Sequence, residues 1–216
     1  LCKQSLNERF SAKSVTFLKK VVEELIEKQS DQYQLSTFSN FKHILIGDCT
    51  SFALPASLGS TYKGPGGIYP SSAIKLYCEY DFLSGSFSCL EDDGWARSDQ
   101  TFNNASRVDK GDLILKDLGF YQVPFFRELH QKGAYFISRL RAGSSLYNQE
   151  KRMDLASLIK DNANDYSLQE YSVSIGNNKK ERSDLGPVRL ILEKVPTAVY
   201  QQKMKRTKTL CASKGK

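Results

Sequence analysis

The order of the apolar segments between residues 42 and 140 constrains the fold of this chain more than any other feature of its sequence. Their periodicity, with the Gly, Pro and Ser residues that flank them, predicts three strands, a helix, a strand, a second helix and a last strand. The predicted strands are 42–48, 72–82, 84–91, 111–117 and 134–143, and the predicted helices are 98–109 and 123–133. Consecutive strands followed by strand–helix–strand units predict an α/β fold with a mixed sheet and flanking helices.

Three strands, a helix, a strand, a helix and a strand is also the order of the ribonuclease H-like core. In that core the first and fourth strands lie side by side. An acid follows the apolar residues of each of these two strands, Asp48 in "ILIGD" and Asp117 in "LILKD". The two aspartates are 69 positions apart in the sequence (117 − 48), yet this fold would bring their carboxylates together.

Two carboxylates that lie close together repel each other unless a cation lies between them. The chain has only two histidines and no pair of cysteines spaced C-x-x-C, so we do not expect a zinc site. Oxygen ligands alone favour Mg²⁺ or Mn²⁺, and two such ions about 4 Å apart can promote phosphoryl transfer. An aspartate after a strand also commonly begins a turn, and the pattern alone leaves that structural role open.

Around this core the composition of the chain changes, and four parts are predicted. They are an N-terminal helical segment at 1–40, a ribonuclease H-like catalytic core at 41–140, a β-rich insertion at 141–197, and a basic tail at 198–216 that starts a further helix. Apolar side chains at helical spacing predict an amphipathic helix at 11–29. In the insertion, 166–176 and 187–196 resemble strands joined by a polar turn, and 153–162 resembles a short helix.

The charge of the chain is concentrated in its tail. The net charge is +7, and residues 203–216 hold six basic and no acidic residues. Removing these six from the 31 basic residues leaves 25 against 24 acidic ones, so the body is nearly neutral. The tail is either a solvated end or a contact for nucleic acid.

Five cysteines without paired spacing suggest reduced thiols and a cytoplasmic protein. No apolar run approaches the ~20 residues of a membrane span.

Several short motifs, taken in order, resemble a known family. They are "LNERF", "SAKSVTFLKK", "ILIGDCTSFALP", "AIKLYCEYDFLSG", "DQTF", "GDLILKDLGFY" and "GAYFISRLRAGSSLY". As a set they resemble a DDE transposase of the insertion-sequence-four group, from about Leu6 to about Lys194. The resemblance implies an enzyme of cut-and-paste DNA transposition. It implies that Asp48 and Asp117 are the first two metal-binding catalytic acids, with Mg²⁺ or Mn²⁺ as cofactor.

The chemistry that the resemblance implies is hydrolysis of a DNA strand, followed by attack of the freed 3′-hydroxyl on a second strand. The implied partners are double-stranded transposon ends and target DNA, bound by a homodimer, with no membrane. The third acid of the family is a glutamate in a helical signature Tyr-x-x-Arg-x-x-x-Glu. Here Tyr200 is followed by Lys203 and Thr207 in place of Arg and Glu. No acid occurs after Glu193, so we expect a truncated, inactive catalytic domain.

Other residues have both a functional and a structural interpretation. Arg139 and Arg141 follow the last core strand and would contact phosphate or simply be solvated, and Lys63 in a Gly/Pro-rich loop would reach DNA or remain a loop lysine. For Asp99 the first interpretation is a helix cap, and the second is a neighbour of the active site.

Two alternative functions stay open, a catalytically inactive DNA-binding remnant and a ribonuclease H-like nuclease. The nuclease needs a third acid within this chain, and Glu170 and Glu193 are poor third ligands because both are expected in strands.

Overall fold

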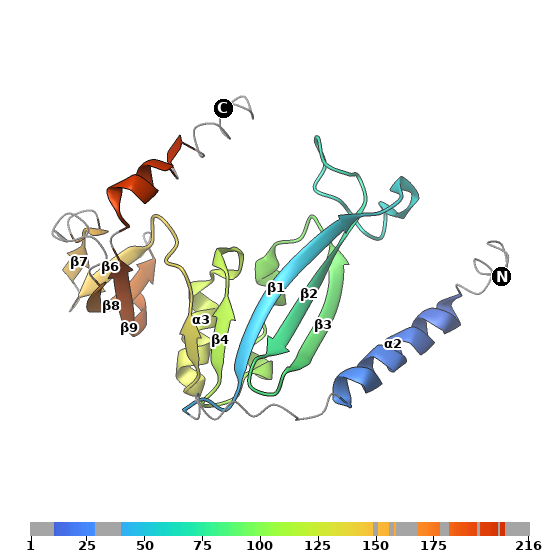
Figure 1. Cartoon of the computed structure of the whole chain (residues 1–216), viewed down its shortest axis with the longest axis horizontal. Coiled ribbons are helices and arrows are strands. Elements are labelled where there is room, and N and C mark those ends of the chain that lie inside the picture. The colour runs from blue at the N-terminus through green and yellow to red at the C-terminus, as the bar shows by residue number, and fades with distance from the viewer. Residues whose placement is uncertain are drawn as a thin grey trace. The chain divides into compact units, whose positions relative to one another are not determined.

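The computed structural model of the protein describes residues 11–28, 40–148, 151–155, 158, 168–177, 182–193, 195–202 and 204–205. The chain forms two compact units, residues 1–141 and 142–216, and each is described by itself. Figure 1 shows the elements of both units in chain order. Within the described ranges, no helix is long and apolar enough to cross a membrane.

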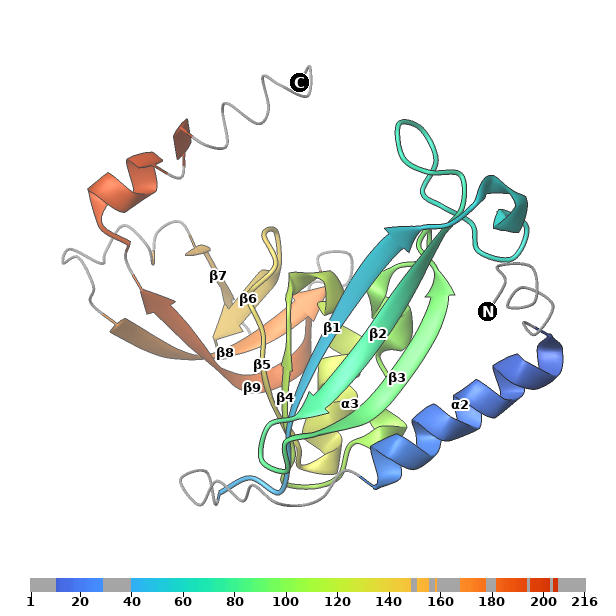
Figure 2. The same cartoon turned by 45° about the vertical axis from the view of Figure 1, so that its right-hand side comes forward.

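The first unit is built on a five-stranded mixed sheet, which confirms the predicted α/β class. Its strands are β1 (Ile44–Ala53), β2 (Ala73–Asp81), β3 (Ser86–Gly94), β4 (Leu113–Lys116) and β5 (Tyr135–Ile137). The strand order is β3-β2-β1-β4-β5, in which β2 is antiparallel to β1 and β3, and β4 is parallel to β1 and β5. Figure 2 shows β1 between β2 and β4. The first and fourth strands are therefore neighbours.

Two helices of the first unit were predicted well. The first is α2 (Ala12–Glu27), and the second is α3 (Val123–Lys132), which has a proline in its first turn. Gly133 ends α3 in the left-handed conformation with φ of 75°, and its N–H donates to carbonyl groups of the last turn. Phe126 of α3 stacks on Phe136 of β5 at 4.5 Å between ring centroids, so α3 covers one face of the sheet.

The predicted helix at 98–109 is wrong, because this segment forms two short 3-10 turns. These are η3 (Asp99–Phe102) and η4 (Ala105–Arg107), and similar turns occur as η2 (Ala56–Leu58) and η5 (Leu118–Phe120). Ser98 caps η3 by accepting a hydrogen bond from the Gln100 N–H, and Asn104 caps η4 through the Ser106 N–H. Because these side chains accept hydrogen bonds from nearby backbone N–H groups, each begins a new short turn, and the segment does not form one continuous helix.

The first strand is longer than predicted. Residues 42–48 were expected to form a strand that ends at Asp48, but β1 continues to Ala53 because its second half pairs with β2. Thr50 is opposite Leu76, and Phe52 is opposite Ile74. Asp48 therefore lies inside β1, whereas Asp117 is the first residue after β4.

The hairpin of β2 and β3 is confirmed, but the buried face of β2 is the more polar one. Its buried residues include Lys75, Tyr77 and Glu79, while Ile74, Leu76 and Cys78 are only partly buried. Tyr77 packs with two aromatic residues of the turns, Phe102 and Phe120. Charged side chains can occupy this face because each has a partner there.

Asp81 at the end of β2 connects the turn of the hairpin to the start of β1. Its buried carboxylate accepts hydrogen bonds from the N–H groups of Ile44 (3.2 Å) and Leu83 (3.1 Å) and lies 2.8 Å from His43 Nδ1. Burial acts to raise the pKa of Asp81, but these hydrogen bonds and one from Ser84 lower it below its ordinary value of 3.8.

A carboxylate with a lowered pKa contributes stability above pH ~4 that is lost as the pH falls through its folded-state pKa. We expect Asp81→Asn to lower the free energy of unfolding at pH 7 by about 1–3 kcal/mol, because buried donors lose a charged acceptor. Urea denaturation between pH 2.5 and pH 7 would measure this. Asp92→Asn is the control, because Asp92 is an exposed residue of β3. An equal loss of stability in both variants would contradict the stabilising role of the Asp81 carboxylate.

The second unit is a four-stranded antiparallel sheet. It consists of β6 (Ser145–Asn148), β7 (Lys151–Met153), β8 (Leu168–Asn177) and β9 (Arg182–Glu193) in the order β7-β6-β8-β9. The polar turn predicted at 177–186 is too long, because β9 already begins at Arg182 and pairs with the end of β8. The predicted helix at 153–162 is described only at 153–155 and 158, where Met153 ends β7 and Leu155 and Leu158 are helical. Apart from Lys205, the basic residues of the tail fall outside the described residues.

Candidate metal and DNA site

The parallel pairing of β1 and β4 determines where the two acids lie. The paired residues run from Ile44 with Leu113 to Gly47 with Lys116. Asp48 comes directly after Gly47, and Asp117 comes directly after Lys116. Because hydrogen-bonded strands lie about 4.8 Å apart, the two backbones are close at this point.

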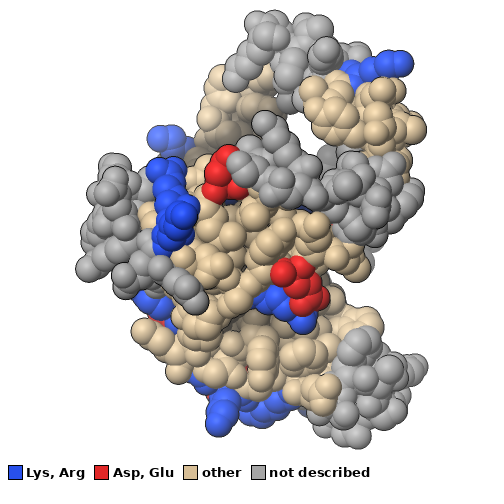
Figure 3. Space-filling view, turned by 90° about the vertical axis from the view of Figure 1, so that its left-hand side faces the viewer, with Lys and Arg blue, Asp and Glu red and all other residues tan. Residues whose placement is uncertain are grey.

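Both acids line one groove of about 550 Å³ at the carboxyl ends of β4 and β5. Its other polar side chains include Ser138 and Arg139, which follow β5. Ile46 and Ile137 add an apolar wall. On the face shown in Figure 3, acidic side chains form a few small groups, and one group lies against basic side chains. The groove thus combines two carboxylates with a cationic side chain.

Each carboxylate is held by one backbone N–H. Asp48 Oδ1 accepts from the Cys49 N–H at 2.8 Å, and Asp117 Oδ1 accepts from the Gly119 N–H at 2.8 Å. In the described part of the chain, neither acid forms an ion pair with a lysine or arginine. The second oxygen of each carboxylate is therefore available for a cation.

Two free carboxylate oxygens are too few to surround a metal ion with protein ligands alone, but they suit an ion such as Mg²⁺ or Mn²⁺ that keeps part of its water shell. Mg²⁺ is commonly bound by one or two carboxylates, while water and substrate phosphates complete its octahedron. Over the residues that the structure describes, no group of three or more His, Cys, Asp or Glu side chains is arranged to hold a metal. Asp48 and Asp117 are thus the two candidate ligands.

A buried ionic cluster lies directly beneath the site. Lys116 Nζ lies 3.9 Å from Glu79 Oε2 and 4.8 Å from the ring centroid of Tyr77, and the Tyr77 hydroxyl donates to Glu79 at 2.6 Å. Desolvation lowers the pKa of Lys116, although Glu79 opposes that shift. A Cβ on Gly47 would lie 2.8 Å from Lys116 Cε, so only glycine admits this packing under β1. Sequence analysis did not identify this cluster.

The remaining candidate residues are not gathered at the groove. Arg141 and Lys63 are exposed, and neither is among the residues that line it. Trp95 packs edge-on against Tyr69 at 5.7 Å between centroids. Glu170 lies in β8, where it pairs with Arg189 at 3.7 Å, and Glu193 ends β9, so both acids are strand residues of the second unit.

Comparison with known proteins identifies the family of the chain. Residues 44–205 match the family model "Transposase DDE domain", and the chain belongs to this family of DDE transposases. It is 36% identical over 152 residues to the transposase of insertion sequence element IS231F from Bacillus thuringiensis subsp. israelensis. These 152 residues are 68% of the chain and 32% of that transposase.

The chain is also similar to the transposase of insertion sequence element IS1151 from Clostridium perfringens. The two are 30% identical over 154 residues, which is 68% of the chain and 32% of that transposase. The chain therefore spans about a third of the length of the curated relatives that it matches.

Proposed function

We propose that this chain supplies the first two metal-binding acids of a DDE transposase and that residues 41–140 form a ribonuclease H-like catalytic core. The observation that carries the proposal is the shared groove of Asp48 and Asp117, which follow directly on paired residues of neighbouring parallel strands. The strand order β3-β2-β1-β4-β5 supports the core assignment. The sheet serves as a rigid mount for both carboxylates.

The proposed reaction is DNA transposition by strand hydrolysis and 3′-hydroxyl strand transfer. Asp48 and Asp117 would hold Mg²⁺ or Mn²⁺, which supplies activation of the attacking oxygen and stabilisation of the leaving oxygen. The backbone N–H groups of Cys49 and Gly119 orient the two carboxylates. Arg139 at the rim of the groove would bind a backbone phosphate and position it over the acids.

The proposed partner is double-stranded DNA, both transposon ends and target, bound by a homodimer in the cytoplasm. The net charge of +7 supports a polyanionic partner. Arg139 and the buried Lys116 both line the groove, and Arg139 is the one of the two that would reach DNA, whereas Arg141 and Lys63 would contact DNA outside it.

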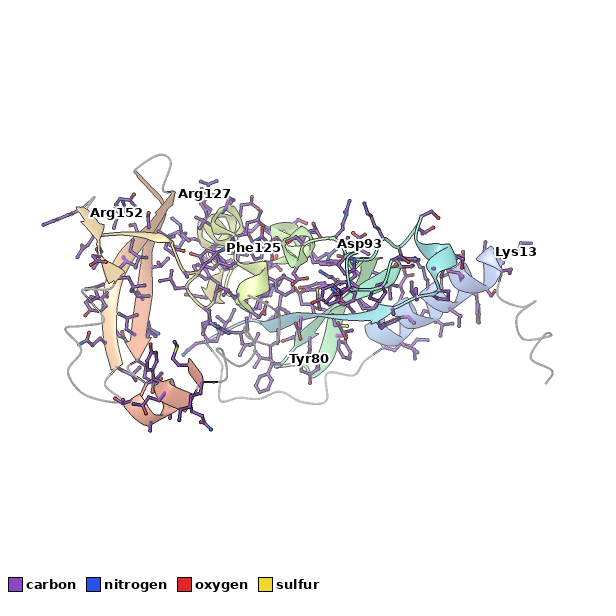
Figure 4. All side chains as sticks on the ribbon, turned by 90° about the horizontal axis from the view of Figure 1, so that it is seen from above. Lys13, Tyr80, Asp93, Phe125, Arg127 and Arg152 are labelled. Carbon is purple, nitrogen blue, oxygen red and sulfur yellow. The ribbon has the colours of Figure 1, made fainter. Side chains whose placement is uncertain are left out.

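Binding of labelled duplex DNA by anisotropy, over a range of salt concentrations, tests this partner. We expect Arg139→Ala to weaken binding about 3–10-fold and to reduce the salt slope by about 1, because one phosphate contact is lost. Arg127→Ala is the control, since Figure 4 places Arg127 on α3 and it does not line the groove. Equal affinities of the wild-type chain and Arg139→Ala would contradict the proposed role of Arg139.

A further inference from the structure

We propose that Asp99 is a positioning residue that fixes the orientation of Asp117, an inference that rests on the proposed metal site. Asp99 lies at the start of η3. Its carboxylate lies against Gly119, the residue whose backbone N–H holds Asp117.

A buried lysine holds Asp99 in place. Lys75 Nζ lies 2.5 Å from Asp99 Oδ1 and donates a second hydrogen bond to the carbonyl oxygen of Arg97 at 2.6 Å. The Lys75 side chain is almost fully buried on the covered face of β2. A charge-assisted bond in such a setting orients the carboxylate more firmly than a solvated ion pair does.

The second oxygen of Asp99 supports the turn that follows Asp117. A Cβ built on Gly119 would lie 2.6 Å from Asp99 Oδ2 and 3.1 Å from Asp117 Oδ1. Gly119 is therefore enclosed between the two carboxylates, and only a hydrogen atom fits there. Because the Gly119 N–H donates to Asp117, the position of Asp99 determines the position of that donor.

The test is Mn²⁺ affinity, measured by the electron paramagnetic resonance signal of free Mn²⁺, alongside urea unfolding. We expect Asp99→Asn to weaken Mn²⁺ binding about 10–100-fold, which is typical for loss of a group that orients metal ligands. Asp93→Asn is the matched control. Asp93 is 33% exposed against 31% for Asp99 and pairs with Arg97 at 3.1 Å, but it is not among the atoms closest to Gly119. We expect its affinity to stay within about twofold of wild type.

Asp99→Asn leaves Lys75 buried without a counter-charge, so a second variant is needed in case it does not fold. Gly119→Ala keeps the Lys75–Asp99 pair but inserts a methyl group between the two carboxylates. We expect it to weaken Mn²⁺ binding and to lower the unfolding midpoint without unfolding the chain, because the methyl group displaces two carboxylates that are at least partly exposed. If Asp99→Asn folds and binds Mn²⁺ as tightly as the wild type, the positioning role is wrong. If Asp99→Asn does not fold, unchanged Mn²⁺ affinity in Gly119→Ala would overturn that role instead.

The same titration separates this inference from the proposed metal site. If Asp48→Asn and Asp117→Asn abolish Mn²⁺ binding and the Asp99 and Gly119 variants do not weaken it, only the positioning role is wrong. If Asp48→Asn and Asp117→Asn leave the affinity unchanged, the metal site and the role of Asp99 are both wrong.

Discussion

Replacing either Asp48 or Asp117 by asparagine is expected to weaken Mn²⁺ binding by at least about 100-fold, which corresponds to about 2.7 kcal/mol. Each substitution removes one of the two carboxylates that line the groove and halves its negative charge. The stability of the fold should change little, because both side chains are exposed and each accepts only one backbone hydrogen bond. Electron paramagnetic resonance of free Mn²⁺ would measure the affinity directly.

The control for this prediction is Glu170→Gln in the second unit. Glu170 pairs with Arg189 in the sheet of β8 and β9, so we expect wild-type affinity. Binding that survives both aspartate substitutions would contradict the metal site and favour a DNA-binding remnant without chemistry. Cleavage of duplex DNA by the isolated chain in Mg²⁺ would instead favour a nuclease.

Glu79→Ala is expected to lower the free energy of unfolding of the first unit by about 3–5 kcal/mol, because it leaves the buried Lys116 charge without a counter-charge. The substitution also removes the acceptor of the Tyr77 hydroxyl and of the Ser88 hydroxyl. Both Glu79 and Lys116 have side chains that are nearly inaccessible to water. Urea denaturation followed by circular dichroism would give the difference.

Two controls separate an uncompensated charge from a general loss of packing. Replacing the pair together, by Glu79→Leu with Lys116→Met, should cost less than Glu79→Ala alone, because no charge remains buried. Glu91→Ala in β3 breaks the ion pair with Arg107 of η4, in which both side chains are partly exposed, and should cost at most about 1 kcal/mol. A double variant as unstable as Glu79→Ala would contradict the charge argument.

The sequence carried enough local information to predict the elements whose signals are short-range. Pro124 and Gly133 bracket α3 because a proline suits the first turn of a helix and a glycine suits its left-handed end. The turn before β3 was predictable for the same reason, since Gly85 adopts a φ of 72° there. The order of these elements was sufficient to predict that the strands before Asp48 and Asp117 would be neighbours.

Other features depend on partners that are distant in the sequence. Helical spacing at 98–109 gave way to two turns because the caps at Ser98 and Asn104 compete with a continuous helix. The end of β1 moved from Asp48 to Ala53 because β2 supplies a hydrogen-bonding partner along its whole length. Strand ends that depend on pairing are not encoded in the strand alone.

By itself, the sequence determined the order of the elements, the mixed sheet and the pair of acids that we propose as ligands. The tertiary structure alone decided that Lys75 and Glu79 point into the protein, because a charged side chain can be buried only where a counter-charge such as Asp99 or Lys116 is brought to it. Those counter-charges come from 24 and 37 positions further along the chain (99 − 75 and 116 − 79). Their placement depends on packing of the whole sheet, and local periodicity cannot report it.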